Sequence, residues 1–163
     1  MVGKLCIRAA KGNKMINFDI NTLIYRPLPQ VFAFVAMPEN DFQWQYATLA
    51  SAQISNGTIG LGTLFRTVGH FLGQRIEAIY EVTEFDTNKS YGFKSVSGPV
   101  ETHSLYTYAM ASAGTRISLF VQTDPKDSIK PQDVIIVKKF KKQYKENLAM
   151  LKSVLETYRI TRQ

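Results

Sequence analysis

Large aromatic side chains at every second position are the residues of this sequence that best suit a binding chemistry. If Val82 and Leu119 face the interior, the same strand faces carry Phe65, Tyr80, Tyr91, Phe93, Tyr106 and Tyr108, with Met110 beyond them. Rigid rings with a few hydroxyl groups suit a flat or aliphatic ligand that needs one or two oriented hydrogen bonds. We therefore predict that these residues bind a ligand, and that Trp44 lies at the rim or forms a lid.

The alternative for these rings is an ordinary core, because any one of them could serve only in packing. Four of the predicted inward positions carry a phenol, and each buried hydroxyl needs a hydrogen-bond partner. Four phenols facing one interior therefore favour a binding site over packing alone.

Two residues are weak candidates for acid-base catalysis, Glu77 and His70. A carboxylate enclosed among tyrosines would have a raised pKa and could abstract a proton. The alternation places Glu77 on the solvent face, unless the phase is wrong by one residue. His70 lies among glycines in a hairpin and His103 lies opposite the tyrosine face, so we expect both at the surface or the rim.

Metal and cofactor chemistry have little support in the sequence. The chain has one cysteine, Cys6, and two histidines, so we expect neither a disulfide framework nor a metal site. The glycines Gly60 and Gly62 lack the third glycine and the following helix of a dinucleotide-binding motif. We therefore expect no cofactor.

Twenty lysines and arginines against thirteen acidic residues give a formal charge of +7. Part of that charge is a cluster off the apolar stripe of the last helix: Lys138, Lys139, Lys141, Lys142 and Lys145. No exposed aromatics or known motif accompany this cluster, so we expect no nucleic acid partner. The alternatives are a solvated face or transient contact with a membrane surface. For the function of the whole domain, a homodimer or partner-binding module whose cavity is collapsed and empty is a further alternative to ligand binding and catalysis.

The elements that would position these residues follow from the periodicity. Residues 16–24 alternate as a strand, Pro27 and Pro29 end it, and the residues up to 46 favour two short helices broken at Pro38. About six further strands follow, separated by turn residues. From Pro131 apolar residues recur three or four apart, which predicts a helix over 131–158.

The size of the chain fits one domain, with 163 residues and a mass of 18.4 kDa. We interpret residues 1–14 as an extension and 15–163 as a single domain. No run of eighteen apolar residues and no convincing signal peptide occur. With one cysteine, the composition is typical of a reducing cytoplasm.

This order of elements predicts an α+β fold: a curved antiparallel sheet of about seven strands wrapped around a long C-terminal helix. Two short helices lie between strands one and two. A helix does not fill the whole concavity of a strongly bent sheet, so we expect a pocket between them.

Several short motifs resemble one known family over about Ile16 to Thr157. They are Gly60 to Thr63, Val82 to Phe85, Ser97 to Pro99, Gly114 to Arg116 and Asn147-Leu148. The chain resembles the polyketide cyclase/dehydrase and lipid-transport branch of the SRPBCC, or START-like, superfamily. The resemblance implies the helix-grip fold and a hydrophobic cavity for lipids or polyketide-like molecules, but no single reaction. One departure is Ala109-Met110, where relatives commonly carry glutamate-proline.

Taken together, the sequence predicts a carrier or sensor that binds a small hydrophobic ligand in an internal cavity. The alternative is an enzyme of the cyclase or dehydratase type that adds an acid or base to the same cavity.

Overall fold

The computed structural model describes residues 15–71, 73–124 and 134–157. The strands are β1 (Ile16–Ile24), β2 (Thr48–Gln53), β3 (Leu64–Phe71), β4 (Gln74–Asp86), β5 (Ser90–Ser97), β6 (Glu101–Ala111) and β7 (Gly114–Asp124). The helices are α1 (Leu28–Val35), the short 3-10 helix η1 (Pro38–Gln43) and α2 (Val134–Thr157). The predicted α+β order of one strand, two short helices, six strands and a long helix is confirmed.

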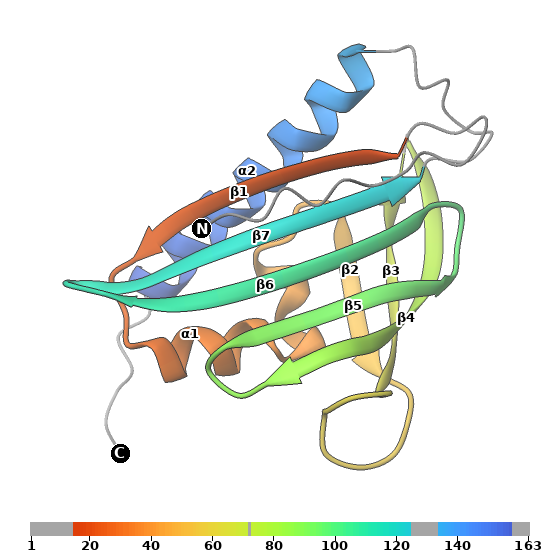
Figure 1. The fold of residues 1–163 in the computed structure, drawn as a ribbon. Helices are drawn as coiled ribbons and strands as arrows, with labels where there is room; N and C mark the ends of the chain where they lie inside the picture. Colours follow the sequence, from red (N-terminus) through yellow and green to blue (C-terminus); the bar gives the residue numbers. More distant parts are fainter. Residues whose placement is uncertain (1–14, 72, 125–133, 158–163) are drawn as a thin grey trace.

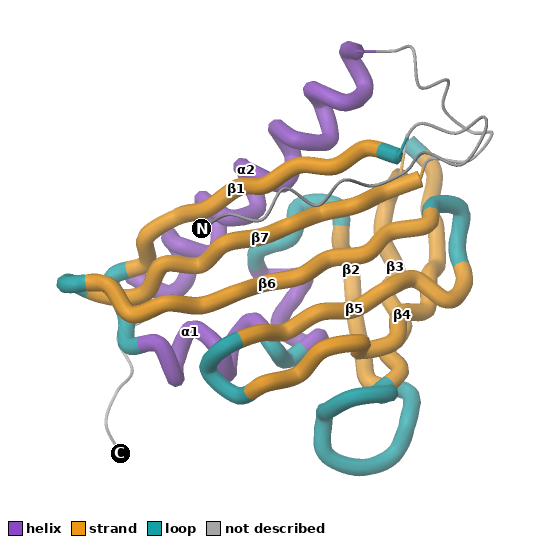
Figure 2. The backbone as a smooth tube through the Cα atoms, in the orientation of Figure 1, coloured by secondary structure: helices purple, strands orange, loops and turns teal. Residues whose placement is uncertain are grey.

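All seven strands form one antiparallel sheet in the order β1-β7-β6-β5-β4-β3-β2. Strands β2 to β7 lie side by side in the order of the sequence, and β1 pairs with β7 at the other end of the sheet. The sheet curves around α2, which lies against its concave face (Figure 1). This arrangement leaves β1 and β2 as the two edge strands, joined in the chain by α1 and η1 (Figure 2).

The predicted phase of the strands is correct. Val82 and Leu119 are buried, and β7 buries every second residue: Thr115, Ile117, Leu119, Val121 and Thr123. Because successive side chains of a strand point to opposite faces, this fixes the interior face of the neighbouring strands through their register.

The helix α1 covers one end of the concave face. It buries Val31, Phe32 and Val35, whose spacing places them on one side of a helix. Pro38 cannot continue an α-helix, and the chain restarts there as η1. The end of the sheet beside α1 is therefore filled with apolar side chains.

The helix α2 has two unequal halves. Leu148, Leu151 and Leu155 in its C-terminal half are buried in the core, whereas Phe140 and Tyr144 in its N-terminal half are only partly buried. The Arg26 guanidinium donates hydrogen bonds to the carbonyl oxygens of Leu155 at 2.9 Å and Glu156 at 2.8 Å. These bonds satisfy carbonyls that the last turn of a helix leaves unpaired.

Some predictions fall outside the described ranges. They concern the extension over residues 1–14, the start of the last helix at 131–133, and Tyr158. Within the described ranges, no helix combines the length and hydropathy needed to cross a membrane.

Candidate ligand-binding pocket

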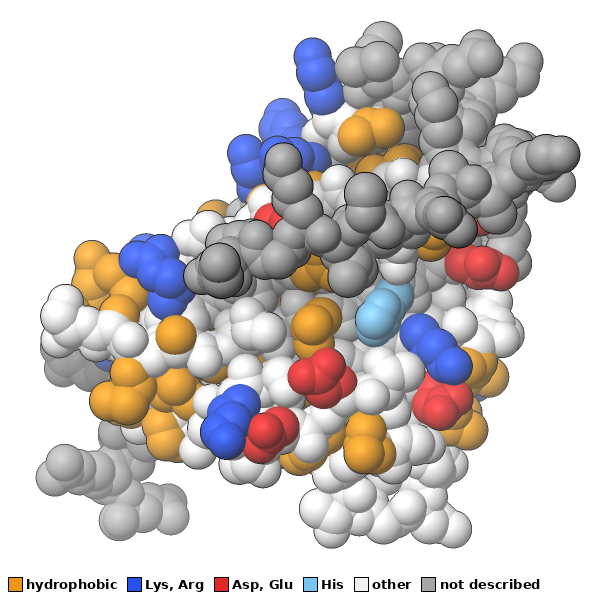
Figure 3. All heavy atoms as spheres, viewed as in Figure 1, with side chains coloured by type: hydrophobic (Ala, Val, Ile, Leu, Met, Phe, Trp, Pro, Cys, Tyr) orange, Lys and Arg blue, Asp and Glu red, His pale blue; other side chains and the backbone are white. Residues whose placement is uncertain are grey.

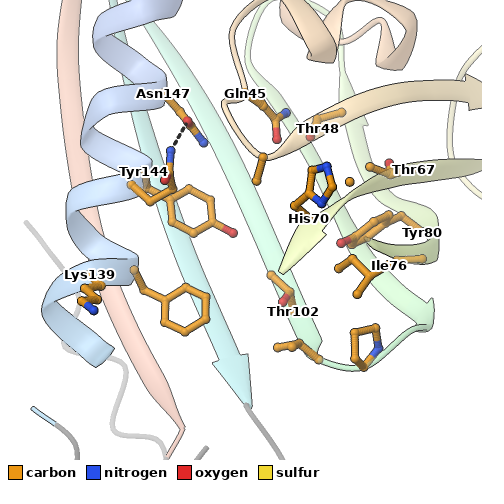
Figure 4. A pocket seen from close by; sticks show the side chains of 17 residues that line it. Gln45, Thr48, Thr67, His70, Ile76, Tyr80, Thr102, Lys139, Tyr144 and Asn147 are labelled. Carbon is orange, nitrogen blue, oxygen red and sulfur yellow. Dashed lines mark hydrogen bonds between the residues drawn. The ribbon is translucent and has the colours of Figure 1, made fainter. Parts of the chain in front are cut away.

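A pocket of about 500 Å³ lies between the N-terminal half of α2 and the strands β2, β3 and β4 (Figure 4). Its apolar wall is formed by Ala47, Ile76, Ala78, Pro99, Val100 and Phe140. Polar side chains complete the lining: Gln45, Thr48, Thr67, His70, Tyr80, Thr102, Lys139, Gln143, Tyr144 and Asn147. This combination of an apolar wall and a set of hydrogen-bonding groups is typical of a small-molecule site.

The segment between η1 and β2 is held against α2 by Asn147. This side chain is buried, and its Oδ1 accepts hydrogen bonds from the backbone N–H of Tyr46 at 3.1 Å and from Gln143 Nε2 at 3.0 Å. The bond to Tyr46 joins residues one hundred and one positions apart in the chain. Asn147 therefore fixes one side of the pocket opening.

The close approach of this segment to β3 depends on Gly69. The N–H of His70 donates to the carbonyl oxygen of Ala47 at 2.8 Å. A Cβ atom at position 69 would collide with that same carbonyl oxygen. Only glycine fits this part of the pocket wall without displacing backbone.

A buried acid, Asp41 of η1, lies outside the pocket lining, and its exposed fraction is 7%. The neighbouring side chains of Gln45 and Ser51 act to lower the pKa of its carboxyl group. Ser51 Oγ lies 2.8 Å from Thr67 Oγ1 across the β2–β3 pair. Burial is the largest effect on Asp41 and raises its pKa well above the usual range, and the nearby Glu39 charge raises it further.

The phenols in and around the pocket are neutral hydrogen-bonding groups. Burial raises the pKa of Tyr80 to about 12, and the Asp41 charge adds to the rise. Burial also raises the pKa of Tyr144, while a hydrogen bond with Ser104 opposes the rise. In Figure 4 the hydroxyl groups of Tyr80 and Tyr144 point into the space between the two walls. A ligand there meets hydroxyl donors and acceptors rather than phenolate.

The predicted aromatic residues share the interior face, but most of them contact one another instead of lining the pocket. Phe65 stacks on Tyr80 at 5.3 Å and meets Phe93 edge-on at 5.2 Å. Tyr91, Phe93 and Tyr106 continue this contact, with centroids 5.5 to 6.3 Å apart. Of the predicted ligand-binding residues, only Tyr80 lines the pocket. These rings fill the part of the concave face on which they lie. The pocket is therefore found beside the N-terminal half of α2.

Three predicted residues lie elsewhere than expected. Trp44 is 2% exposed and packs edge-on against Tyr106, so it belongs to the core rather than to a rim or lid. Tyr108 packs against Phe32 of α1, at the filled end of the sheet. Met110 is 85% exposed and lies outside the interior, because it is close to the turn where β6 leads into β7.

The two catalytic candidates, Glu77 and His70, lie in different parts of the molecule. Glu77 lies on the outer face of β4, exposed and paired with Arg66 at 2.8 Å, as the alternation predicted. His70 is also solvent-exposed, but it borders the pocket beside Thr48 and Thr67. Of the two, only His70 is placed where it could reach a bound molecule.

Sequence reasoning missed Gln45 and Thr67, which line the pocket, and the burial of Asp41. Nothing in the sequence around Asp41 distinguishes it from a solvated acid in a short helix. Phe140 and Tyr144 were assigned only to the apolar stripe of the last helix, although their spacing of four residues could have placed both on the pocket wall. Among the described residues, no group of three His, Cys, Asp or Glu side chains could hold a metal ion.

Comparisons with known proteins give structural matches only. No family model matches the sequence, and no curated protein is similar to it in sequence. Ara h 8.0201 is similar in structure, with a TM-score of 0.68, 15% identity, and 89% of this chain and 100% of that chain covered. A protein of Thermus thermophilus matches with a TM-score of 0.67, 15% identity and coverage of 89% and 100%.

A plant protein gives a similar match. Ginseng major latex-like protein 151 from Panax ginseng has a TM-score of 0.68 and 10% identity, with 85% of this chain and 96% of that chain covered. At such identities the likeness concerns the fold. The sheet topology, the gripped helix and these matches show that the chain has the helix-grip fold that the sequence predicted.

Proposed function

We propose that this chain is a cytoplasmic carrier or sensor that binds a small hydrophobic molecule in the pocket between α2 and the sheet. The observation that carries the proposal is the pocket itself, about 500 Å³ with an apolar wall and a few polar groups. This volume falls within the range of ligand sites in proteins, roughly 300 to 1,000 Å³. The composition, with its single cysteine, supports a reducing compartment.

The lining favours a ligand with an apolar body and one or two uncharged polar groups, such as a lipid or a polyketide-like aromatic. Apolar burial supplies the affinity, at about 25 cal/mol per Å² before the costs of association. The hydroxyls of Tyr80 and Tyr144 then fix the orientation. Among the pocket-lining residues, the cationic side chain is the exposed Lys139, so recognition of a buried anion has little support.

Filling the pocket tests this function. Ile76 lines it from β4, and Ile76→Trp should abolish binding of the neutral dye N-phenyl-1-naphthylamine. The matched control is Ile79→Trp, on the opposite face of the same strand, which should bind the dye as the unmodified protein does. Mass spectrometry of an organic extract of the purified protein would then identify a native ligand. Equal dye binding by both variants would contradict the proposal.

A second candidate function is a cyclase or dehydratase, favoured by the position of His70 at the pocket. There its imidazole could remove a proton next to a ketone of a bound polyketide-like substrate, with the Tyr80 hydroxyl as hydrogen-bond donor. Turnover of a polyketide mimic that is lost in His70→Gln but kept in Glu77→Gln would establish this function. Dye binding without turnover would favour the carrier.

Contact with a membrane would let such a carrier exchange its ligand. Lys138, Lys139, Lys141 and Lys142 are all exposed on α2, and Lys139 also borders the pocket. Lysine side chains gather along this part of the helix (Figure 3). Near an anionic bilayer each lysine contributes about 1 kcal/mol. Vesicles containing phosphatidylserine should therefore sediment the protein at low salt, and changing these lysines to glutamine should abolish sedimentation.

A further inference from the structure

A second hollow, of about 440 Å³, lies between β1 and α2 and shares no lining residue with the ligand pocket. On the strand it is lined by residues 19–22, and on the helix its lining includes Lys141, Lys145 and Lys152. Because β1 is an edge strand, one side of its backbone pairs with β7 and the other side has no neighbouring strand (Figure 1). We call this hollow the edge groove.

Two hydrogen bonds show which backbone groups of β1 point to its open side. The carbonyl oxygen of Leu23 accepts a hydrogen bond at 2.6 Å from Lys152 Nζ, on α2. The N–H of Tyr25, two residues further on, donates to Glu156 Oε1, also on α2, at 2.9 Å. In an antiparallel pair, successive residues direct their N–H and C=O groups alternately toward the partner strand and away from it. The residues of β1 that direct both groups to the open side are therefore Asn17, Asp19, Asn21 and Leu23.

The open side of β1 is closed at one end only. Lys152 and Glu156 pair with each other at 2.7 Å and bond to the C-terminal end of the strand. Within the described part of the chain, no hydrogen bond reaches the outward backbone groups of Asn17, Asp19 or Asn21. These residues span about 13 Å, at roughly 3.3 Å per residue, which is enough for about five residues of a further strand. Free strand edges of this kind bind extended peptides by adding them to the sheet.

The charges beside the open edge determine which peptide fits. Lys141 and Lys145 are exposed and have no ion-pair partner among the described residues. They are about 6 Å apart along the helix, close to the roughly 6.6 Å between alternate residues of a strand. Asp19 points to the opposite side of the strand from Phe18, whose ring contacts Tyr144 of α2 at 5.2 Å. A strand added here would meet two positive charges on its α2 side and one negative charge on its outer side.

We propose that the edge groove binds an extended acidic segment of a partner protein, which pairs with β1 and presents Asp or Glu at alternate positions to Lys141 and Lys145. The backbone groups of β1 accept any extended chain, and the two lysines select acids that are two residues apart. The net charge of +7 favours the approach of an acidic partner. This interaction is independent of ligand binding, because the groove and the pocket share no residue.

The test compares short capped peptides by NMR of the isotope-labelled full chain. A peptide of alternating threonine and glutamate has its acids on one side of a strand. A second peptide has the same residues in two blocks, and therefore the same charge without the alternation. The alternating peptide should shift the amide signals of Asn17, Asp19 and Asn21, protect these amides from hydrogen exchange, and bind at least about threefold more tightly.

Methylation of peptide nitrogens separates strand pairing from attraction between charges. In the alternating peptide bound as a strand, the glutamate N–H groups point to one side and the threonine N–H groups to the other. Only one of these two sets can face β1. N-methylation of that set should abolish binding, and N-methylation of the other set should leave the dissociation constant within about twofold of the unmethylated value.

Variants of the protein test the two parts of the groove. Lys141→Gln and Lys145→Gln should each weaken binding of the alternating peptide about two- to fivefold. Lys89→Gln removes the same charge from the turn between β4 and β5, outside the groove, and should have no effect. Asp19→Pro removes an outward N–H and should weaken binding, although it also removes a repulsive charge. Asp19→Asn keeps that N–H and should strengthen binding.

The outcomes decide the proposal without affecting the proposed function. If neither peptide binds, or if the alternating and block peptides bind equally, the proposal is overturned. Equal binding by the two methylated peptides would also overturn it, because charge alone would then explain the interaction. The methylated peptides keep the test decisive if Asp19→Pro does not fold. Binding of N-phenyl-1-naphthylamine in the pocket should be the same in all these variants, whatever the peptides show.

Discussion

The two ends of the layer between sheet and helix are built differently. At one end α1 inserts Val31, Phe32 and Val35, and the C-terminal half of α2 adds Leu148 and Leu151, all buried. At the other end no comparable helix of the described chain covers the sheet, and the N-terminal half of α2 faces a pocket of about 500 Å³. One sheet and one helix thus enclose a filled core and an open site.

The difference shows how this fold separates stability from binding. The filled end joins distant segments through burial and through the Arg26 bonds to the last carbonyls of α2. The open end keeps its shape through a few polar contacts, namely the Asn147 bonds and the contact between the Ser51 and Thr67 hydroxyls. Changes at the two ends should therefore alter different measured properties.

The largest effect on stability is expected at the filled end. Leu151 is fully buried, so Leu151→Ala should lower the free energy of unfolding by about 2 to 5 kcal/mol. Phe140→Ala removes a larger side chain but one that is only partly buried at the pocket, so it should cost about 1 kcal/mol. Urea unfolding measures both. A greater loss from Phe140→Ala would show that the pocket end holds the fold together.

A smaller effect should appear as a dependence of stability on pH caused by Asp41. Its pKa in the folded protein is raised, so between the unfolded value, about 3.9, and the folded value only the unfolded state releases the proton. Stability should fall as pH rises through this window, by up to about 1.4 kcal/mol per unit, and then stay constant. Below the unfolded pKa the contribution vanishes, because both states are protonated.

Comparison with Asp41→Asn isolates this contribution from the other carboxyl groups. The free energy of unfolding of the variant minus that of the unmodified protein should increase as pH rises above about 4, because only the unmodified protein loses stability through Asp41. A difference that is constant with pH would mean that Asp41 ionises in the folded protein as it does in the unfolded chain.

The smallest effect concerns the contact that closes the filled end. Arg26→Met keeps much of the side-chain length but removes the two bonds to the carbonyl oxygens of Leu155 and Glu156, and should cost about 1 kcal/mol. Arg116, which is exposed and bonds Asn21 Oδ1 at 3.0 Å, provides the control, since Arg116→Met should change stability by less than about 0.5 kcal/mol. Neither variant should alter dye binding, since neither residue lines the pocket.

The fold was predictable because it depends on periodicity. Alternation around Val82 and Leu119 gave the correct interior face, and Pro38 correctly separated the two short helices. The positions of single side chains at the site were less predictable. Tyr80 lines the pocket as expected, but Phe65 and Tyr106 on the same face pack against other rings. The spacing of residues along a strand determines which face of the sheet their side chains share. Whether a side chain lines a cavity depends instead on which other elements cover that face.

The polar part of the site was not predictable for the same reason. Asp41, Ser51 and Thr67 come from three elements, and no spacing rule connects an acid in a short helix with hydroxyls on two strands. The prediction that Trp44 lies at the rim was wrong. Its position between two elements of the chain indicated a rim, but its side chain packs against Tyr106 and is buried.

The sequence by itself determined the order of elements, the inward face of each strand and the apolar stripe of the last helix, because these depend on near neighbours along the chain. Only the tertiary structure decided where the interior is filled and where it is hollow. That outcome depends on where α1 lies along the concave face, and contacts between residues far apart in the chain set this position.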